Sequence, residues 1–451
     1  MSIRTRSGSA AGGNGSSLPR HMVPGVSLPA MAHDTLLFAP KCLVVTSRYD
    51  YPELLRNCLG VIYTAYSECL VGVGGERIRL ETLVGNLIGS VYVPPPDGPQ
   101  VRFSLGATDK MTLQPSKYSS LPSTGTKVAL LFQQLGIRNV LTLLCATITE
   151  LKILFYSRSF NRLTDACTAL VSLIYPMKYT HVFIPILPSS LIEVLATPTP
   201  FIIGINSVHE NEICDLLDVV KVDLDGGAIT IPENMTIHTL PERIQVKVQN
   251  ELCAVLNPEL ALADNAFHAA SGPGGSGRKP QISLDKELRA VILRLMVQLL
   301  QGYRSCLTLV RIHPAPYITF HKAAFLGLRE MCDSPFMRRL LECMFFNSFI
   351  SERGLPWRTC DIFDELYSNF GEQHLIEREE PAKTLVHIKI LAEEILRCEN
   401  PLSTHNQPYA QKIPQPAEGA MSRVHQPVFP VLEGDLIEDL ISKGIERYKI
   451  E

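Results

Sequence analysis

The amino-acid sequence predicts an α/β fold followed by a mainly helical region. Between residues 140 and 205, apolar segments of strand length alternate with segments of helical periodicity, a pattern that favours parallel strands covered on both faces. The stretch SGPGGSGRKP at residues 271–280 then separates this region from a series of amphipathic helices. With 451 residues, the chain has room for two to four domains.

Composition excludes several classes of protein. Apolar residues make up 46% of the chain and charged residues 19%, and the net charge is -3. A nucleic-acid binder would be strongly basic, so we expect no nucleic-acid partner. The twelve cysteines are scattered singly and form no C-x2-C pair, which favours free thiols in a reduced, cytoplasmic protein. We expect no metal and no cofactor.

One apolar segment is long enough to cross a membrane. Residues 182–205 carry a single charge, at Glu193, and span the length that a bilayer requires. Four prolines interrupt the segment, and each removes a backbone donor and breaks a helix. We therefore predict short buried strands here and no transmembrane segment.

The N-terminal third begins without periodicity. Residues 1–33 are rich in Ser, Gly, Arg and Pro, so we expect a disordered tail. A β-rich strand at residues 42–46 and helices at 52–66 and 77–89 follow. Residues 94–122 read as a connector with one strand near residues 101–105.

The central third alternates between strands and helices. The spacing predicts, in order, helices at 127–135 and 139–150, a strand at 152–157, a helix at 161–175 capped by Asn161, a strand at 181–187, a short helix at 189–195 and a strand at 200–205. Two strands follow around Asp225-Gly226-Gly227, because adjacent glycines close tight hairpins.

The C-terminal third is predicted to be helical. The helix expected at residues 241–256 still precedes the linker. After the linker, helices are expected at 283–303 with Ser283 as the cap, and at 322–330, 335–346, 360–367, 383–397 and 436–448.

Motifs for phosphate chemistry are weak. C-x5-R, the minimal spacing of a cysteine phosphatase loop, occurs at residues 42–48 and 332–338. The first lies in a predicted strand and the second contains Pro335. GPGGSGRK at 272–279 imitates a P-loop, but Arg278 stands where the lysine belongs and no apolar strand precedes it. We expect no phosphatase activity, and a linker in place of a nucleotide loop.

Polar residues gather at the ends of the strand at 152–157. Glu150, Arg158, Asn161, Arg162 and Asp165 flank it. Loops at the carboxyl ends of parallel strands commonly form binding surfaces, whereas a solvated rim of charges is the simpler explanation. The residues alone leave both open.

The amino-acid sequence of the central segment resembles that of a known family. LFQQLGIRNVLTLLCATITELKILFYS at 131–157 and LIYPMKYTHVFIPILPSSLIEVLATPTPFIIGI at 173–205 are similar to the central module of DENN domains. LLFAPKCLVVTSR at 36–48 resembles the end of the upstream module, and residues 283–370 resemble the downstream one. The likeness is closest to the N-terminal DENN portion of the myotubularin-related SET-binding-factor pseudophosphatases. Tyr179 stands where many members have Trp.

The resemblance implies a bilobed DENN architecture with a longin-like N-lobe, a central α/β lobe and an appended mainly α region. On this basis the chain divides into a disordered tail (1–33), a partial upstream module (34–95), a connector (96–126), the central module (127–260), a flexible linker (261–281), the helical downstream module (282–370) and a partly helical C-terminal extension (371–451). We expect the N-lobe to be truncated, which leaves a sheet edge that another copy or another chain could pair with.

The resemblance also implies a function. DENN domains act as guanine-nucleotide exchange factors for Rab-type small GTPases, so we expect a GTPase regulator without chemistry of its own. The alternative is a non-catalytic Rab-binding or assembly scaffold. We expect a cytoplasmic protein, associated with endosomal or vesicle membranes only peripherally and through partners.

Two sets of residues follow from these expectations. For GTPase docking we predict polar positions on the loops that flank the central sheet: Arg138, Asn139, Arg158, Asn161, Arg162 and Lys178. The positions that match the family motif, which we expect to be mostly structural, are Tyr179, His181, Pro188, Pro198, Pro200 and Phe201.

Overall fold

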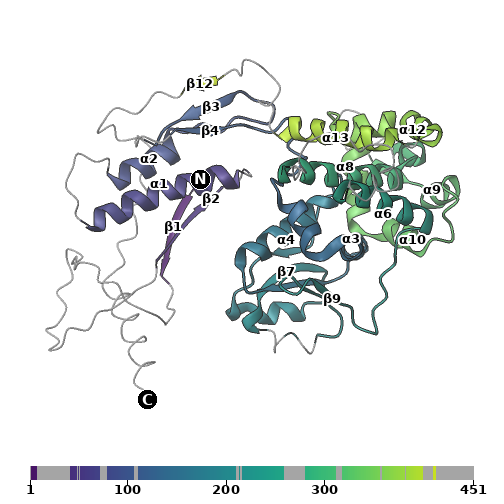
Figure 1. Cartoon of the computed structure of the whole chain (residues 1–451), viewed down its shortest axis with the longest axis horizontal. Helices are drawn as coiled ribbons and strands as arrows, with labels where there is room; N and C mark the ends of the chain where they lie inside the picture. Colours follow the sequence, from purple (N-terminus) through teal and green to yellow (C-terminus); the bar gives the residue numbers. More distant parts are fainter. Residues whose placement is uncertain are drawn as a thin grey trace, which may run out of the picture. The chain divides into compact units, whose positions relative to one another are not determined.

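The structure is a computed structural model, and it describes residues 2–7, 41–47, 49, 51–71, 79–105, 110–209, 213, 216–257, 280–310, 317–355, 358–380, 382–399 and 410–412. The chain divides into two compact units (Figure 1). The first comprises residues up to Pro115 together with those from His405 onward, and the second runs from Ser116 to Thr404. Two units agree with the expected bilobed α/β class.

In the first unit, two helices and two small sheets surround one apolar core. Its elements are β1 (Ser2–Ser7), β2 (Lys41–Thr46), α1 (Pro52–Val71), α2 (Leu80–Gly89), β3 (Gln100–Phe103), β4 (Met111–Leu113) and β12 (Ala410–Lys412). The core gathers Cys58 and Ile62 of α1 with Leu83 of α2 and Val101 of β3. The buried Asn86 donates to the carbonyl of Leu105 at 2.8 Å and ties α2 to the end of β3.

Two expectations for this unit are wrong. Residues 2–7 are not a disordered tail but a strand, which pairs antiparallel with β2 from Ser2 opposite Thr46 to Ser7 opposite Lys41. The alternation of Ile3 and Thr5 with arginines is the period-2 signal that a strand needs. The strand expected near residues 101–105 is confirmed as β3, but the segment 96–126 is more than a connector, because β3 pairs with β4 and Val101, Phe103, Met111 and Leu113 belong to the core.

A five-stranded sheet forms the centre of the second unit. Its order is β6-β7-β5-β8-β9, from β5 (Ile153–Ser157), β6 (Val182–Ile184), β7 (Phe201–Asn206), β8 (Val220–Asp223) and β9 (Ala228–Thr230). The first four strands are parallel, and β9 closes an antiparallel hairpin with β8. β5 alternates between the two cores on either face: Ile153 and Phe155 join one, and Leu154 joins the other.

Helices α3 (Lys127–Ile148) and α4 (Phe160–Leu173) cover one face of this sheet. The sequence predicts two helices where α3 runs, and the structure explains why: Gly136 has a φ of 76° and breaks the helical path. Only glycine adopts that conformation without strain. The cap of α4 is Ser159, not Asn161, because its side chain accepts from the amide of Arg162. Short 3₁₀ helices η1 (Ser189–Ala196) and η2 (Ser207–His209) flank β7.

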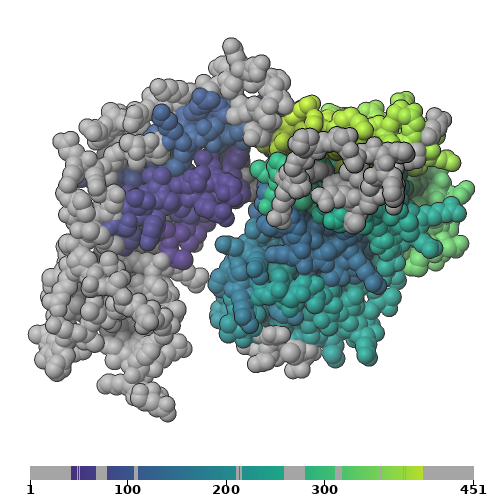
Figure 2. Space-filling model, in the orientation of Figure 1, coloured from purple at the N-terminus to yellow at the C-terminus, as the bar shows by residue number. Residues whose placement is uncertain are grey.

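The remaining elements of the second unit are mainly helical. They are α6 (Glu242–Leu256), α8 (Gln281–Leu300), η3 (Tyr303–Cys306), β10 (Leu307–Val310), β11 (Tyr317–Phe320), α9 (Lys322–Leu328), α10 (Pro335–Glu342), α11 (Met344–Arg353), α12 (Ile362–Glu379) and α13 (Lys383–Glu399). α8 is buried on all sides and joins the central lobe to the other helices, so that the unit is one continuous body (Figure 2).

The predicted boundaries need correction here. α12 crosses the expected limit at residue 370, and Ile388, Leu391 and Ile395 of α13 lie in the same core as α8. Residues up to 399 therefore belong to the helical module rather than to an extension. α8 begins at Gln281, and the predicted cap Ser283 lies inside it. The β10–β11 hairpin was not predicted.

Several expectations lie outside the described residues. They are most of the linker at 261–281, which includes the P-loop-like stretch, the helix at 436–448 and the rest of the tail after residue 7. Ten cysteines of the described residues are free thiols. One described helix, α3, is apolar and long enough to cross a membrane, but 56% of its most apolar window is buried inside the protein. It is the core helix of the central lobe.

Candidate functional site

The carboxyl edge of the central sheet carries a cluster of polar side chains. β5 ends at Ser157 and β8 ends at Asp223, and these strands are paired in parallel with Tyr156 opposite Asp223. The loop from β5 to α4 and the turn from β8 to β9 therefore meet at the same edge. We call the exposed surface of these two loops and the adjoining part of α3 the carboxyl-edge face. It comprises residues 138–139, 157–162 and 225–227.

Asp225 holds the two loops together. Its carboxylate accepts a hydrogen bond from the amide of Arg158 at 2.9 Å and from the hydroxyl of Ser157 at 2.8 Å. Nη1 of Arg162 lies 2.8 Å from Oδ1 of Asp225. The amide of Arg158 is the largest cause that holds the pKa of Asp225 below its usual value, with Ser157 and Arg162 adding to it against some burial. The loop that follows β5 is thus fixed before any partner arrives.

The turn from β8 to β9 lies tightly against the break in α3. Gly227 has a φ of 72°, and a Cβ at this position would lie 2.7 Å from the carbonyl oxygen of Gln134. Nδ2 of Asn139 donates to the carbonyl of Gly227 at 3.3 Å. A side chain at residue 227 would push the turn away from α3, so the glycine is required for this contact.

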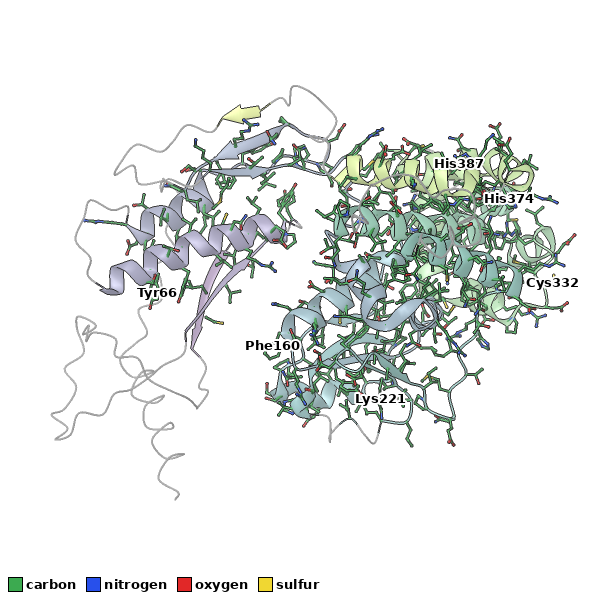
Figure 3. All side chains as sticks on the ribbon, in the orientation of Figure 1. Tyr66, Phe160, Lys221, Cys332, His374 and His387 are labelled. Carbon is green, nitrogen blue, oxygen red and sulfur yellow. The ribbon has the colours of Figure 1, made fainter. Side chains whose placement is uncertain are left out.

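Five of the six residues predicted for docking lie in the carboxyl-edge face. The side chains of Arg138, Arg158, Asn161 and Arg162 are exposed there, whereas Asn139 is half-buried. The sequence reasoning did not single out Phe160, which is 52% exposed at the first position of α4 (Figure 3). A phenylalanine directly after a Ser cap, at the first position of its helix, is the signal that could have identified it.

Lys178 lies elsewhere. It precedes β6, whose first residues lie at the amino edge of the parallel sheet, and its Nζ is 2.7 Å from Oε2 of Glu352 in α11. β5 separates the two edges by five residues, or roughly 16 Å at about 3.3 Å per residue. Lys178 is therefore not part of the carboxyl-edge face, because its loop enters a strand while the loops of that face leave one.

Glu150 also lies at the amino edge. Its Oε1 accepts from the amide of Met344 at 2.6 Å, at the start of α11. Nε2 of His181 approaches the same oxygen to 3.1 Å, without the geometry of a hydrogen bond. Glu150 has a φ of 58°, and its contacts tie the central lobe to the helical module. We interpret this edge as structural.

The family-motif positions have different surroundings. Phe201 is fully buried, and the rings of Tyr179 and His181 pack on Phe345 with centroids 5.4 and 5.1 Å away. Burial is the main cause that raises the pKa of Tyr179, and the negative charge of Glu150 is the second. The prolines do not enter the core. Pro188 is exposed and precedes the first turn of η1. Pro198, which is exposed, and Pro200, which is half-buried, precede β7.

Neither C-x5-R segment forms a phosphate loop. Cys42 lies in β2, where the extended backbone is paired with β1. Arg338 donates through Nε to the carbonyl of Cys332 at 2.6 Å, so its guanidinium closes a turn. Within the described ranges, no group of three His, Cys, Asp or Glu side chains could hold a metal ion.

Comparison with known proteins agrees with this architecture. Residues 38–227 match the DENN (AEX-3) domain family. The chain is 33% identical over 252 residues to "Myotubularin-related protein 5" of Caenorhabditis elegans, a match that covers 54% of this chain and 14% of that protein. It is 27% identical over 276 residues to "DENN domain and WD repeat-containing protein SCD1" of Arabidopsis thaliana, covering 59% of this chain and 22% of that protein. The chain therefore spans a minor part of both relatives.

Proposed function

Because the chain contains a DENN (AEX-3) domain at residues 38–227, we propose that it binds a Rab-type small GTPase and promotes the release of GDP. The DENN family is related in general to Rab exchange factors. An exchange factor needs no proton-transfer group, because it acts by binding the nucleotide-free state more tightly than the nucleotide-bound state.

The carboxyl-edge face is our candidate for GTPase docking. The observation that carries this choice is the pinning of the Ser157–Arg162 loop by Asp225. A loop fixed in advance loses little conformational entropy on binding. It carries the exposed side chains of Arg158 and Phe160, and arginine and aromatic side chains are enriched among the residues that dominate protein interfaces.

One observation favours the alternative, a Rab-binding scaffold without exchange activity. The described strands of the first unit form two separate small sheets, β1-β2 and β12-β3-β4, and not one continuous sheet. If exchange requires a continuous sheet in that lobe, the chain would bind a GTPase without accelerating release. Binding and release must therefore be measured separately.

The deciding experiment combines both measurements. Release of a fluorescent GDP analogue is followed for a panel of purified Rabs with and without this chain, and binding to each nucleotide-free Rab is measured in parallel. We expect acceleration of at least one Rab, together with preferential binding of its nucleotide-free form. Binding without acceleration at micromolar concentration supports the scaffold, and absence of both rejects the proposal.

Variants locate the surface. We expect Arg158→Glu and Phe160→Ala each to weaken Rab binding at least tenfold, since a truncated interface hot spot costs about 2 kcal/mol or more. Lys178→Glu is the matched control, because Lys178 is an exposed cation at the opposite edge of the sheet. If Lys178→Glu weakens binding and Arg158→Glu does not, the docking face is misplaced.

A further inference from the structure

A pocket of about 560 Å³ opens between α6, α12 and the start of α13. Its ionisable lining residues are Arg243, Lys247 and Glu251 of α6 and His374, Glu377 and Arg378 of α12. His374 of α12 is labelled in Figure 3 beside His387 of α13. The volume lies in the range of small-molecule sites. None of these residues belongs to the carboxyl-edge face.

The spacing of the basic residues places them on two opposing walls. Arg243 and Lys247 are four residues apart on α6, and His374 and Arg378 are four residues apart on α12. Side chains at this spacing share one helix face. Both pairs line the pocket, so basic groups face it from both helices.

The two carboxylates contribute little free negative charge. Both oxygens of Glu377 lie 2.7 Å from Nη2 of the buried Arg294, and one of them is 2.8 Å from Nδ1 of His387. Burial raises the pKa of Glu251, and Arg294 and Lys247 only partly oppose this. Burial therefore favours the neutral form of Glu251.

The ammonium group of Lys247 lacks a close anion. Its Nζ is 3.8 Å from Glu251 and 3.9 Å from Glu377, and 3.4 Å from Nδ1 of His374. Charge-assisted hydrogen bonds of an ammonium group are typically about 2.7–2.9 Å long. Lys247 thus lines the pocket with donors available to a ligand, and Arg243 and Arg378 add two further cations.

The neighbouring positive charges also affect the pKa of His374. Burial is the first cause that lowers the pKa of His374, and Lys247 of α6 is the second. Arg378 on its own helix and Arg294 of α8 lower it further, against the opposing charge of Glu377. An anion bound beside Lys247 would offset these cations and raise the pKa of the imidazole.

We propose that this pocket binds a small soluble anion that carries at least two phosphate groups, with Lys247 as its main ligand. Three cations on two walls outnumber the two carboxylates of the lining, and one of these, Glu377, is already paired with Arg294. Lysine and the arginine guanidinium are also the side chains that hold phosphate oxygens through several donors at once.

The experiment uses inorganic pyrophosphate as the probe and isothermal titration calorimetry on the whole chain. We expect saturable one-to-one binding, weakened at least tenfold by Lys247→Gln. Arg378→Gln serves as a second variant, because its side chain is exposed and its loss does not threaten folding. Lys383→Gln, at an exposed lysine of α13 paired with Glu380 at 3.0 Å, is the control and should bind as the wild type does.

A second readout tests the electrostatic argument. The imidazole of His374 is titrated by NMR with and without pyrophosphate, and its pKa should rise when the anion is bound. The proposal is rejected if pyrophosphate shows no saturable binding, or if Lys247→Gln and Arg378→Gln both bind it as tightly as the wild type does.

Two further results would also overturn it. Lys247-dependent binding to phosphatidylcholine vesicles that contain phosphatidylinositol 4,5-bisphosphate, without pyrophosphate binding, would assign the pocket to a lipid head group. Saturable binding of spermidine that Glu251→Gln abolishes would assign it to cations. Because no GTPase is present in these assays, their outcome is independent of the exchange proposal.

Discussion

Replacing Asp285 should destabilise the second unit strongly, because this residue of α8 caps the beginning of α3. Its fully buried carboxylate accepts from the hydroxyl of Thr124 at 2.6 Å and from the amides of Val128 and Ala129 at 2.8 and 3.1 Å. No side chain of α3's own N-cap position forms a cap hydrogen bond, so the cap is supplied from 157 residues away. Lys286 also approaches the same carboxylate to 3.2 Å.

The magnitude follows from these contacts. Loss of a helix cap costs about 0.5–2 kcal/mol, and removal of one member of a buried charge pair costs about 3–5 kcal/mol. The two costs are not simply added, because Lys286 still has an ion pair with Glu399 at 2.6 Å when Asp285 is removed. We therefore expect Asp285→Ala to lower the free energy of unfolding by about 3–5 kcal/mol. Asp285→Asn, which retains one acceptor oxygen without the charge, should lose roughly half as much.

Urea unfolding followed by circular dichroism measures the effect. With a slope of about 3 kcal/mol per M, a loss of this size moves the midpoint down by about 1 to 1.7 M. Hydrogen exchange should also quicken at the amides of Val128 and Ala129. The control is Asp333→Ala, since Asp333 is fully exposed and 3.8 Å from Arg338, and it should leave the midpoint unchanged. A wild-type midpoint for Asp285→Ala would refute the capping argument.

Two further predictions concern a close approach and a buried ion pair. Gly204→Ala should lower the free energy of unfolding by about 1–3 kcal/mol, because a Cβ at residue 204 would lie 2.1 Å from the carbonyl oxygen of Pro185. Gly371→Ala in α12 should raise it by up to about 1 kcal/mol, because a Cβ there would have no neighbour within 4 Å. Equal urea midpoints for the two variants would contradict this packing argument. Burial alone would raise the pKa of Asp361, but the hydrogen-bonded Arg353 holds this pKa well below its usual value. The stability that the Asp361 carboxylate contributes is therefore complete above the pKa that Asp361 has in the unfolded chain, about 4, and is lost as the pH falls. The difference in unfolding free energy between wild type and Asp361→Asn should therefore be about 1 kcal/mol smaller at pH 3 than at pH 7, and a larger difference at pH 3 would reverse the sign of this argument.

Much of the central lobe could be predicted because its signals are local. Apolar strands, a Ser-capped helix and a glycine turn each depend on neighbouring residues, and even the break at Gly136 separates two predicted helices. The β1–β2 pair could not be placed in the same way. It joins segments more than thirty residues apart, and the short alternation of residues 2–7 looks irregular until its partner strand is known.

The candidate site was predictable only where loops follow strands. Arg158 and Arg162 were placed correctly at the sheet edge, because they follow a recognisable buried strand. Asp225, which pins them, was seen only as a turn residue, since its partners lie more than sixty residues away. That Lys178 lies at the opposite edge could not be foreseen, because charge alone does not tell whether a loop leaves a strand or enters one.

The continuity of the core through α8 has a consequence for how the protein can be divided. The family match ends at residue 227, but the apolar side chains beneath α3 and α4 are completed by α8 and α13. A fragment that ended at the family boundary would expose the underside of both helices to water and leave the beginning of α3 without the carboxylate of Asp285. Such a fragment should aggregate or remain partly unfolded. The evolutionary module and the cooperative folding unit therefore have different ends, and a fragment that keeps the helical core must extend at least to residue 399.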